Sequence, residues 1–160
     1  AESLLTMAAL ATPVVAVVIG EGGSGGALAI GVADRVLMLE NAVYSVVSPE
    51  GCASILWKDA GKAPEAAETM RMTAPDLKRF GIIDELIPES SPAHEKPRDA
   101  ILAVGEALRR HLDELSALAA GPDGIKQLLD ARYKKFRQIG AWREGIARDT
   151  RLPETALDAV

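Results

Sequence analysis

The sequence is poor in cysteine, in aromatic side chains and in positive charge. Its one cysteine, Cys52, excludes an internal disulfide and a metal cluster made of cysteines alone, and it fits a reducing compartment. Aromatic residues make up 4% of the chain and the formal net charge is −5, which disfavours nucleic acid as the main partner. Neither histidine has a second ligand at metal spacing, so we expect no bound metal.

Long apolar runs are also missing. Pro13 and many glycines interrupt the longest apolar stretch, so the sequence predicts neither a membrane span nor a signal peptide with a basic start. What is present is a chain of 160 residues, 48% hydrophobic and 26% charged, which suffices for one globular domain with a core. Because the first residue is alanine, we expect the chain to begin inside a larger protein.

Glycine, by contrast, is concentrated in one segment. "GEGGSGGALAIG", residues 20–31, holds six glycines and follows the β-branched run "PVVAVVIG". That run predicts a short buried strand, and "GGALAIGVA" predicts a closely packed, buried helix that ends near Ala33. In the order strand, glycine loop and helix, the first amides of the helix lack an intrahelical acceptor and face whatever lies there.

From the residues alone, three interpretations of this loop stay open. Gly20, Gly22 and Gly25 match the dinucleotide pattern G-x-G-x-x-G, and Glu40 lies at the distance of its ribose-binding carboxylate. The second is an oxyanion hole of backbone amides, and the third is a turn whose glycines serve packing only. A P-loop is excluded, because Gly-Ala stands where that motif needs lysine and a hydroxyl.

Alternating strand and helix signals downstream predict an α/β domain. Ser48 at an N-cap and prolines in first turns mark helix starts, Thr73 and Asp76 have capping-box-like spacing, and Gly81 marks a helix end. The expected strands are 14–19, 35–40, 42–48 and 82–87; the expected helices cover 1–12 and then begin near 48, 62 and 73; residues 88–97 are expected to be a loop.

The last third of the chain predicts a helical pair packed on the α/β part. Two apolar stripes at helical spacing are separated by Gly121-Pro122, and the weak pattern from about Arg143 predicts a frayed end. We therefore divide the chain into a domain at 1–96, a helical extension at 97–142 and a poorly patterned tail at 143–160. The stripes consist of Ile101, Val104, Leu108, Leu112 and Leu115, and of Ile125, Leu128, Leu129, Tyr133, Phe136 and Ile139.

The order of these segments resembles the crotonase superfamily, in which a stretch like "TAPDLKRFGIIDELIP" forms a helix, a glycine and a strand. "PVVAVVIGEGGSGGALAIGVAD", "YSVVSPEGCASILWKDAGKAPEAAE" and "ARYKKF" resemble, more specifically, the carboxyltransferase α subunit of multi-subunit bacterial or plastid acetyl-CoA carboxylase. The resemblance runs from about Ala1 to about Ile139. It implies the C-terminal part of a crotonase-like superhelix of ββα units, followed by a C-terminal helical extension.

The resemblance also implies an activity. It is the transfer of CO2 from carboxybiotin, on a biotin carboxyl carrier protein, to acetyl-CoA, which gives malonyl-CoA in the first committed step of fatty acid synthesis. A β subunit, in an α2β2 assembly in the cytoplasm or plastid stroma, would complete the site and carry the zinc. Gly25 and Gly26 match the glycines whose amides form the oxyanion hole at the biotin ureido oxygen, and Gly22 and Gly23 line the same loop on the carboxybiotin side.

Two rival functions stay open. The first is a crotonase-type acyl-CoA hydratase or isomerase, against which Leu28 speaks: it stands where those hydratases carry a catalytic glutamate, and it cannot exchange a proton. The second is a non-catalytic fragment that only binds a partner subunit, because the upstream loop that supplies the other oxyanion amide in crotonase folds is absent from the sequence.

Other residues have a structural and a functional interpretation. Glu50 favours a helix dipole or acts as an acid, Glu21 shapes the loop or acts directly, and Cys52 is a packing residue or a reactive thiol. His94 and His111 are expected at the surface. Tyr44 and Trp57 are expected in the core or in a subunit interface. A basic cluster is expected to be a solvated face or a docking site: Lys126, Arg132, Lys134, Lys135 and Arg137.

Overall fold

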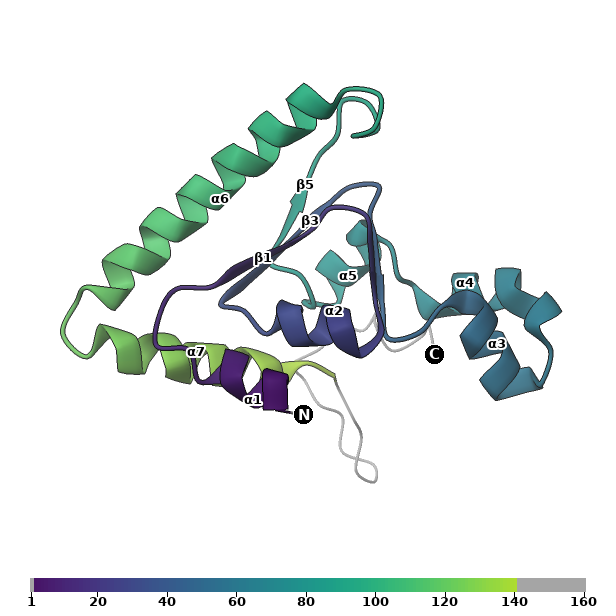
Figure 1. Ribbon diagram of the computed structural model, residues 1–160, viewed down its shortest axis with the longest axis horizontal. Coiled ribbons are helices and arrows are strands. Elements are labelled where there is room, and N and C mark those ends of the chain that lie inside the picture. Colours follow the sequence, from purple (N-terminus) through teal and green to yellow (C-terminus); the bar gives the residue numbers. More distant parts are fainter. Residues whose placement is uncertain (1, 141–160) are drawn as a thin grey trace.

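The computed structural model describes residues 2–140 as an α/β fold that ends in a long helical hairpin (Figure 1). The strands are β1 (Val15–Val18), β2 (Glu21–Gly23), β3 (Arg35–Leu39), β4 (Val43–Ser45) and β5 (Glu85–Ile87). The helices are α1 (Glu2–Ala8), α2 (Ser24–Gly31), α3 (Pro49–Trp57), α4 (Ala63–Met70), α5 (Ala74–Arg79), α6 (Pro97–Ala119) and α7 (Gly124–Gln138), with a 3-10 turn, η1, at Ala60–Lys62. The tail predicted from about Arg143 lies outside the described residues.

The strands form two parallel sheets, one in the order β1-β3-β5 and one of β2 and β4. Strand β3 is central, and its residues 36–39 are all buried. The continuous apolar run "VLML" explains this place, because a parallel strand covered on both faces has no polar side to show. Leu77 of α5 and Ala107 of α6 join the same core. The predicted α/β class is confirmed.

The local signals for helix ends are also confirmed. The Ser48 hydroxyl oxygen accepts a hydrogen bond from the Gly51 amide at 3.1 Å, which caps α3, and Gly81 takes a φ of +70° after α5. Thr73 is the N-cap of α5, but its hydroxyl donates to the Asp76 carboxylate at 2.9 Å, and its side chain accepts no backbone amide. The capping-box prediction was therefore right in position and different in bonding.

The predicted helical pair is confirmed as α6 and α7, which meet at the connecting turn and diverge from it, while α1 lies along α7 (Figure 1). The predicted stripes are confirmed only in part: Leu115 and Leu128 are buried, but other members are not. Ile101 and Tyr133 are exposed. The buried residues are Ala107, His111 and Leu115 on α6, and Gly124, Leu128 and Arg132 on α7. No helix within residues 2–140 is long and apolar enough to cross a membrane.

Arg132 was expected on a solvated face, and this was wrong, because only 2% of it is exposed. Its guanidinium forms a fork with the Asp34 carboxylate, Nε at 2.9 Å and Nη2 at 2.8 Å. The same group donates to the carbonyl oxygens of Met7, Leu10 and Thr12 at 2.9 to 3.0 Å. Arg132 therefore joins α7 to the end of α1 and to the start of β3. Its burial is possible because every donor direction has an acceptor.

Two more ionisable residues that were expected at the surface are buried or half-buried. Lys135 is half-buried and pairs with Asp84, and burial lowers the pKa of its ammonium group. His111 is buried, with Nε2 2.5 Å from a carboxylate oxygen of Glu85. Glu85 also accepts from Arg110, whose hydrogen bond holds the Glu85 pKa below its ordinary value of 4.5. These pairs fix the helical hairpin to the sheet. His94 is exposed, as predicted.

Candidate functional site

The glycine segment connects the two sheets, and its predicted order of strand, loop and helix is confirmed with one change. After β1, the chain turns at Gly20 and forms β2, whose Gly22 and Gly23 pair with Tyr44 and Ser45 of β4. Helix α2 begins directly afterwards at Ser24. Half of the predicted loop is therefore a short strand. It fixes the start of α2 relative to β4.

The first turn of α2 has no cap of its own. Gly23 is the N-cap residue in an extended conformation, and no side chain accepts a hydrogen bond from the first turn. Gly25 and Gly26 follow in that turn, where backbone N–H groups have no intrahelical acceptor. With the positive end of the helix dipole behind them, these amides can bind a negatively polarised oxygen.

Within the described residues, neither packing nor backbone conformation requires glycine at Gly25 or Gly26. A Cβ at either position would meet no other group within 4 Å, and neither φ is positive. Gly22 differs, because its Cβ would lie 3.0 Å from the Tyr44 ring and 3.2 Å from the Val18 side chain. Gly22 thus has a packing reason. Gly25 and Gly26 have no such packing reason among the described residues, and without a Cβ their backbone is open to close approach.

Ser24 is the residue of the site that the sequence reasoning missed. It has a φ of +60° at the junction of β2 and α2, a conformation that side chains other than glycine rarely adopt. Strained residues of this kind gather at functional sites. A signal was present, because residues 22–26 read Gly-Gly-Ser-Gly-Gly and match the strand-to-helix elbow pattern G-x-S-x-G.

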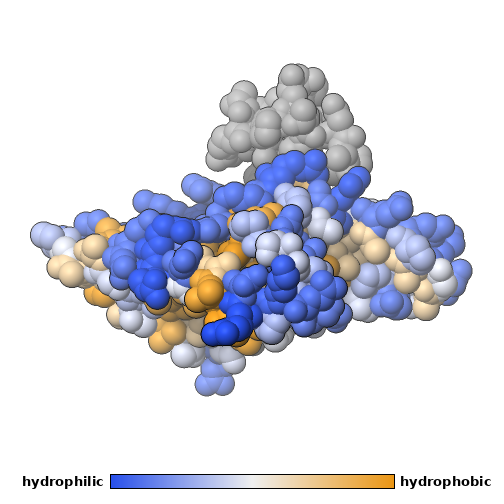
Figure 2. Space-filling view, turned by 90° about the horizontal axis from the view of Figure 1, so that it is seen from above, coloured by the Kyte–Doolittle hydropathy of each residue, from blue (hydrophilic) through white to orange (hydrophobic). Residues whose placement is uncertain are grey.

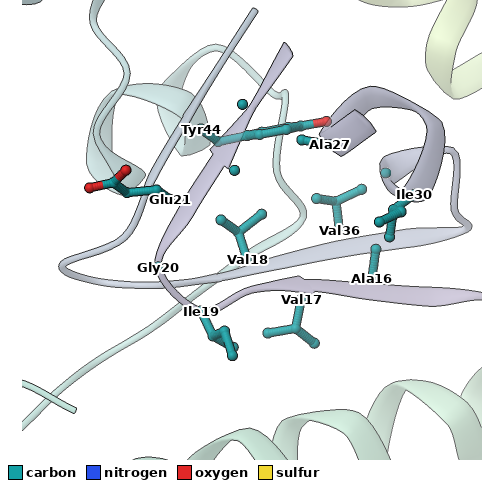
Figure 3. Close-up of a pocket in the computed structure, with 13 residues that line it drawn as sticks. Ala16, Val17, Val18, Ile19, Gly20, Glu21, Ala27, Ile30, Val36 and Tyr44 are labelled. Carbon is teal, nitrogen blue, oxygen red and sulfur yellow. The ribbon is translucent and has the colours of Figure 1, made fainter. Parts of the chain in front are cut away.

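A cavity of about 390 Å³ lies beside this junction, between β1, β2 and α2 (Figure 3). Ala16, Val18 and Val36 form apolar walls, Gly22 and Gly23 belong to the lining, and Gly25 and Gly26 do not. The cavity is thus next to the uncapped amides and not identical with them. In Figure 3 the Tyr44 ring crosses the cavity over Val18.

Helix α2 was expected to be buried, and this was wrong. Gly31 is its only buried residue, while Leu28 and Ile30 are 43% and 69% exposed. The apolar composition was read correctly, but the described residues cover one face of the helix. Figure 2 shows further apolar patches at the surface. Apolar surface of this extent is typical of a face that another chain covers.

The dinucleotide interpretation does not fit the structure. Such a site needs the glycine loop to lead straight from a strand of the main sheet into a helix. Here β2 intervenes, in a different sheet. The Glu40 carboxylate accepts the Glu89 amide at 2.9 Å and is thereby engaged at the turn before α6.

The remaining candidates are dispersed. Glu50 is exposed in the first turn of α3, Cys52 is half-buried on the same helix, and Glu21 is exposed at the cavity. Trp57 is 39% exposed, with the Lys62 ammonium 5.9 Å from its ring centre, so of its two expected places the core was wrong and the subunit interface stays a prediction. Among residues 2–140, no three His, Cys, Asp or Glu side chains are grouped to hold a metal ion.

Comparison with known proteins identifies the family of this chain. The acetyl-coenzyme A carboxylase carboxyl transferase subunit alpha of Aquifex aeolicus is 56% identical over 144 residues, which are 89% of this chain and 43% of that protein. The Prochlorococcus marinus subunit alpha is 51% identical over 154 residues, 96% of this chain and 45% of that protein. The chain therefore spans less than half the length of these relatives.

A third relative, from Salinispora arenicola, is named carboxyl transferase subunits beta/alpha; it is 52% identical over 152 residues, 94% of this chain and 26% of that protein. Among solved structures, a chain of the Pseudomonas malonate decarboxylase hetero-tetramer in complex with coenzyme A has a TM-score of 0.54 at 19% identity, over 84% of this chain and 54% of that chain. That likeness shows a shared fold. Residues 1–140 match the family described as acetyl co-enzyme A carboxylase carboxyltransferase-like, and the chain belongs to this family.

Proposed function

We propose that this chain supplies the α side of the carboxyltransferase half-reaction of acetyl-CoA carboxylase. The observation that carries the proposal is the uncapped first turn of α2, at Gly25 and Gly26, in a member of this family. In the reaction, the N–CO2 bond of carboxybiotin breaks and a C–C bond forms to the methyl carbon of acetyl-CoA. The methyl proton moves to the released ureido nitrogen, so that malonyl-CoA and biotin are the products.

The role of Gly25 and Gly26 follows from charge. As the N–CO2 bond breaks, negative charge develops on the ureido oxygen, and two fixed N–H donors stabilise it. Gly22 and Gly23 form the adjacent edge on the carboxybiotin side. The position next to Gly26 and Ala27 carries Leu28, so this turn offers orientation and charge stabilisation rather than a proton-exchanging side chain.

The partners follow from the same family. The Salinispora arenicola relative joins beta and alpha subunits in its name, and we infer that this chain works with a β subunit, in an α2β2 assembly. The other partners are the biotin carboxyl carrier protein and acetyl-CoA or malonyl-CoA, in the cytoplasm or plastid stroma. Exposed apolar residues such as Leu28 and Ile30 fit a covered face; they equally favour the second candidate, a fragment that binds its partner without catalysis.

A segment exchange tests the proposal. This chain replaces the matching segment of the Aquifex aeolicus relative, and the chimera is mixed with a β subunit, malonyl-CoA and a biotin analogue. Acetyl-CoA release above that of β alone, and its loss in Gly25→Val, are expected. A chimera that is folded and β-bound yet silent would favour the binding fragment, and hydration of crotonyl-CoA would favour the hydratase. The unaltered relative is the positive control.

A further inference from the structure

Tyr44 forms a bridge between β4 and α2 that the function outlined above does not use. Its ring lies against the cross-strand neighbour Gly22, where a Cβ would come within 3.0 Å of the ring edge. Its hydroxyl oxygen lies against α2 at Gly31, where a Cβ would be 2.5 Å away. In Figure 3 the hydroxyl reaches α2 beside Ala27, one turn before Gly31 and on the same face.

The backbone of Tyr44 is held in place on both sides. Tyr44 is fixed through its backbone, because its amide donates to the Met72 carbonyl oxygen at 3.1 Å and its register partner is Gly22. The two glycines make room for opposite ends of the same side chain. Gly31 is the only buried residue of α2, so the contact with the Tyr44 hydroxyl lies on the covered face of that helix, which α1 and β2 also contact.

We propose that Tyr44 is a positioning residue: its length sets the distance between β4 and α2, and thereby the direction of the amides at Gly25 and Gly26. The contact with Gly22 lies just before the first turn of α2, and the contact with Gly31 lies at the end of the helix. With contacts before and after it, the Tyr44 side chain holds the first turn of α2 in place. The catalytic consequence rests on the proposed function, whereas the geometric one does not.

The test uses size complementarity. Gly31→Ala adds a methyl group that collides with the hydroxyl, and Tyr44→Phe removes the hydroxyl and leaves the ring carbon at 3.5 Å, an ordinary contact. In the chimera with a β subunit, we expect Gly31→Ala to lower kcat about 100-fold with KM little changed. Tyr44→Phe loosens the helix and should lower kcat a few-fold. The kcat of the double variant should return to within a few-fold of the wild-type value.

Gly105→Ala is the matched control, because Gly105 also lies in a helix, where a Cβ meets no atom within 4 Å. It should leave kcat unchanged. A second readout is the set of backbone amide NMR shifts of Gly25 and Gly26 in the full chain. Gly31→Ala should move both shifts, and the double variant should restore them, which a general loss of stability would not produce.

The outcomes separate the two hypotheses. If the wild-type chimera transfers no carboxyl group, the proposed function fails and the NMR shifts still test Tyr44. If Gly31→Ala keeps full kcat and unmoved shifts, or if the double variant is as impaired as Gly31→Ala alone, Tyr44 does not position the turn. Circular dichroism at the assay temperature confirms that each variant is folded.

Discussion

Replacing Gly25 by valine should separate catalysis from folding. The added Cβ meets no other group within 4 Å in the described residues, and the φ of Gly25 is not positive, so the Cβ adds neither a clash nor backbone strain. Valine also has a higher helix propensity than glycine, by about 0.5 kcal/mol. We expect the free energy of unfolding in urea to stay within about 0.5 kcal/mol of the wild-type value.

Activity should respond differently, because the two valine methyl groups occupy the space through which an oxygen approaches the amides. Loss of one oxyanion donor costs about 3–4 kcal/mol in the transition state, or about 100- to 1000-fold in kcat. The assay is acetyl-CoA release from malonyl-CoA by the chimera with a β subunit.

Gly105→Val is the control for this substitution, since it makes the same change on an open helix position away from the glycine segment. A Gly25→Val protein that transfers at the wild-type rate would refute the oxyanion assignment. If the Gly25→Val protein does not fold, the conclusion that no group packs against this position is refuted.

Four further results are expected. Arg132→Ala leaves the Asp34 carboxylate buried without its partner and should cost about 3–5 kcal/mol in urea unfolding; a loss below 1 kcal/mol would show that the pair is dispensable. Gly124→Ala places a Cβ on carbonyl oxygens of the last turn of α6 and should cost about 1–3 kcal/mol, measured in the same way. The pKa of Glu85 is lowered in the fold, so stability present above pH 4.5 should be lost as the pH falls through the folded value, and Glu85→Gln should flatten this acid limb in thermal unfolding at stepped pH. Glu50→Gln should keep transfer within a few-fold of wild type if the carboxylate only favours the helix dipole, whereas a drop of about 100-fold would make it a catalytic acid.

The features that the sequence predicted well depend on neighbours in the chain. Proline in the first turn and Ser48 at the cap locate α3 because these signals act within three residues. The strand ahead of the glycine segment is equally local. The functional prediction depended on the motifs shared with the family, since the geometry of the loop alone is compatible with several ligands.

The features that could not be predicted from the sequence depend on interaction partners that are distant in the chain. Arg132 lies four residues after Leu128, and His111 lies midway between Ala107 and Leu115, so both occupy the buried line of their helices. A buried face that is predicted from apolar residues alone is turned toward Ile101 on α6 and Tyr133 on α7, which are both exposed. A charged residue inside an apolar line is a usable signal, but its partner cannot be read from the pattern.

The Arg132 fork also orders events during synthesis of the chain. Asp34 and Arg132 are separated by 98 residues, and the carbonyl oxygens that Arg132 binds are still closer to the N-terminus. Contacts of such separation slow folding, because a long loop must close before the contact forms. A ribosome-bound chain that has reached α6 would hold an unneutralised Asp34 carboxylate where the native state has a dry ion pair. The start of β3 therefore gains its final stability only when α7 has emerged.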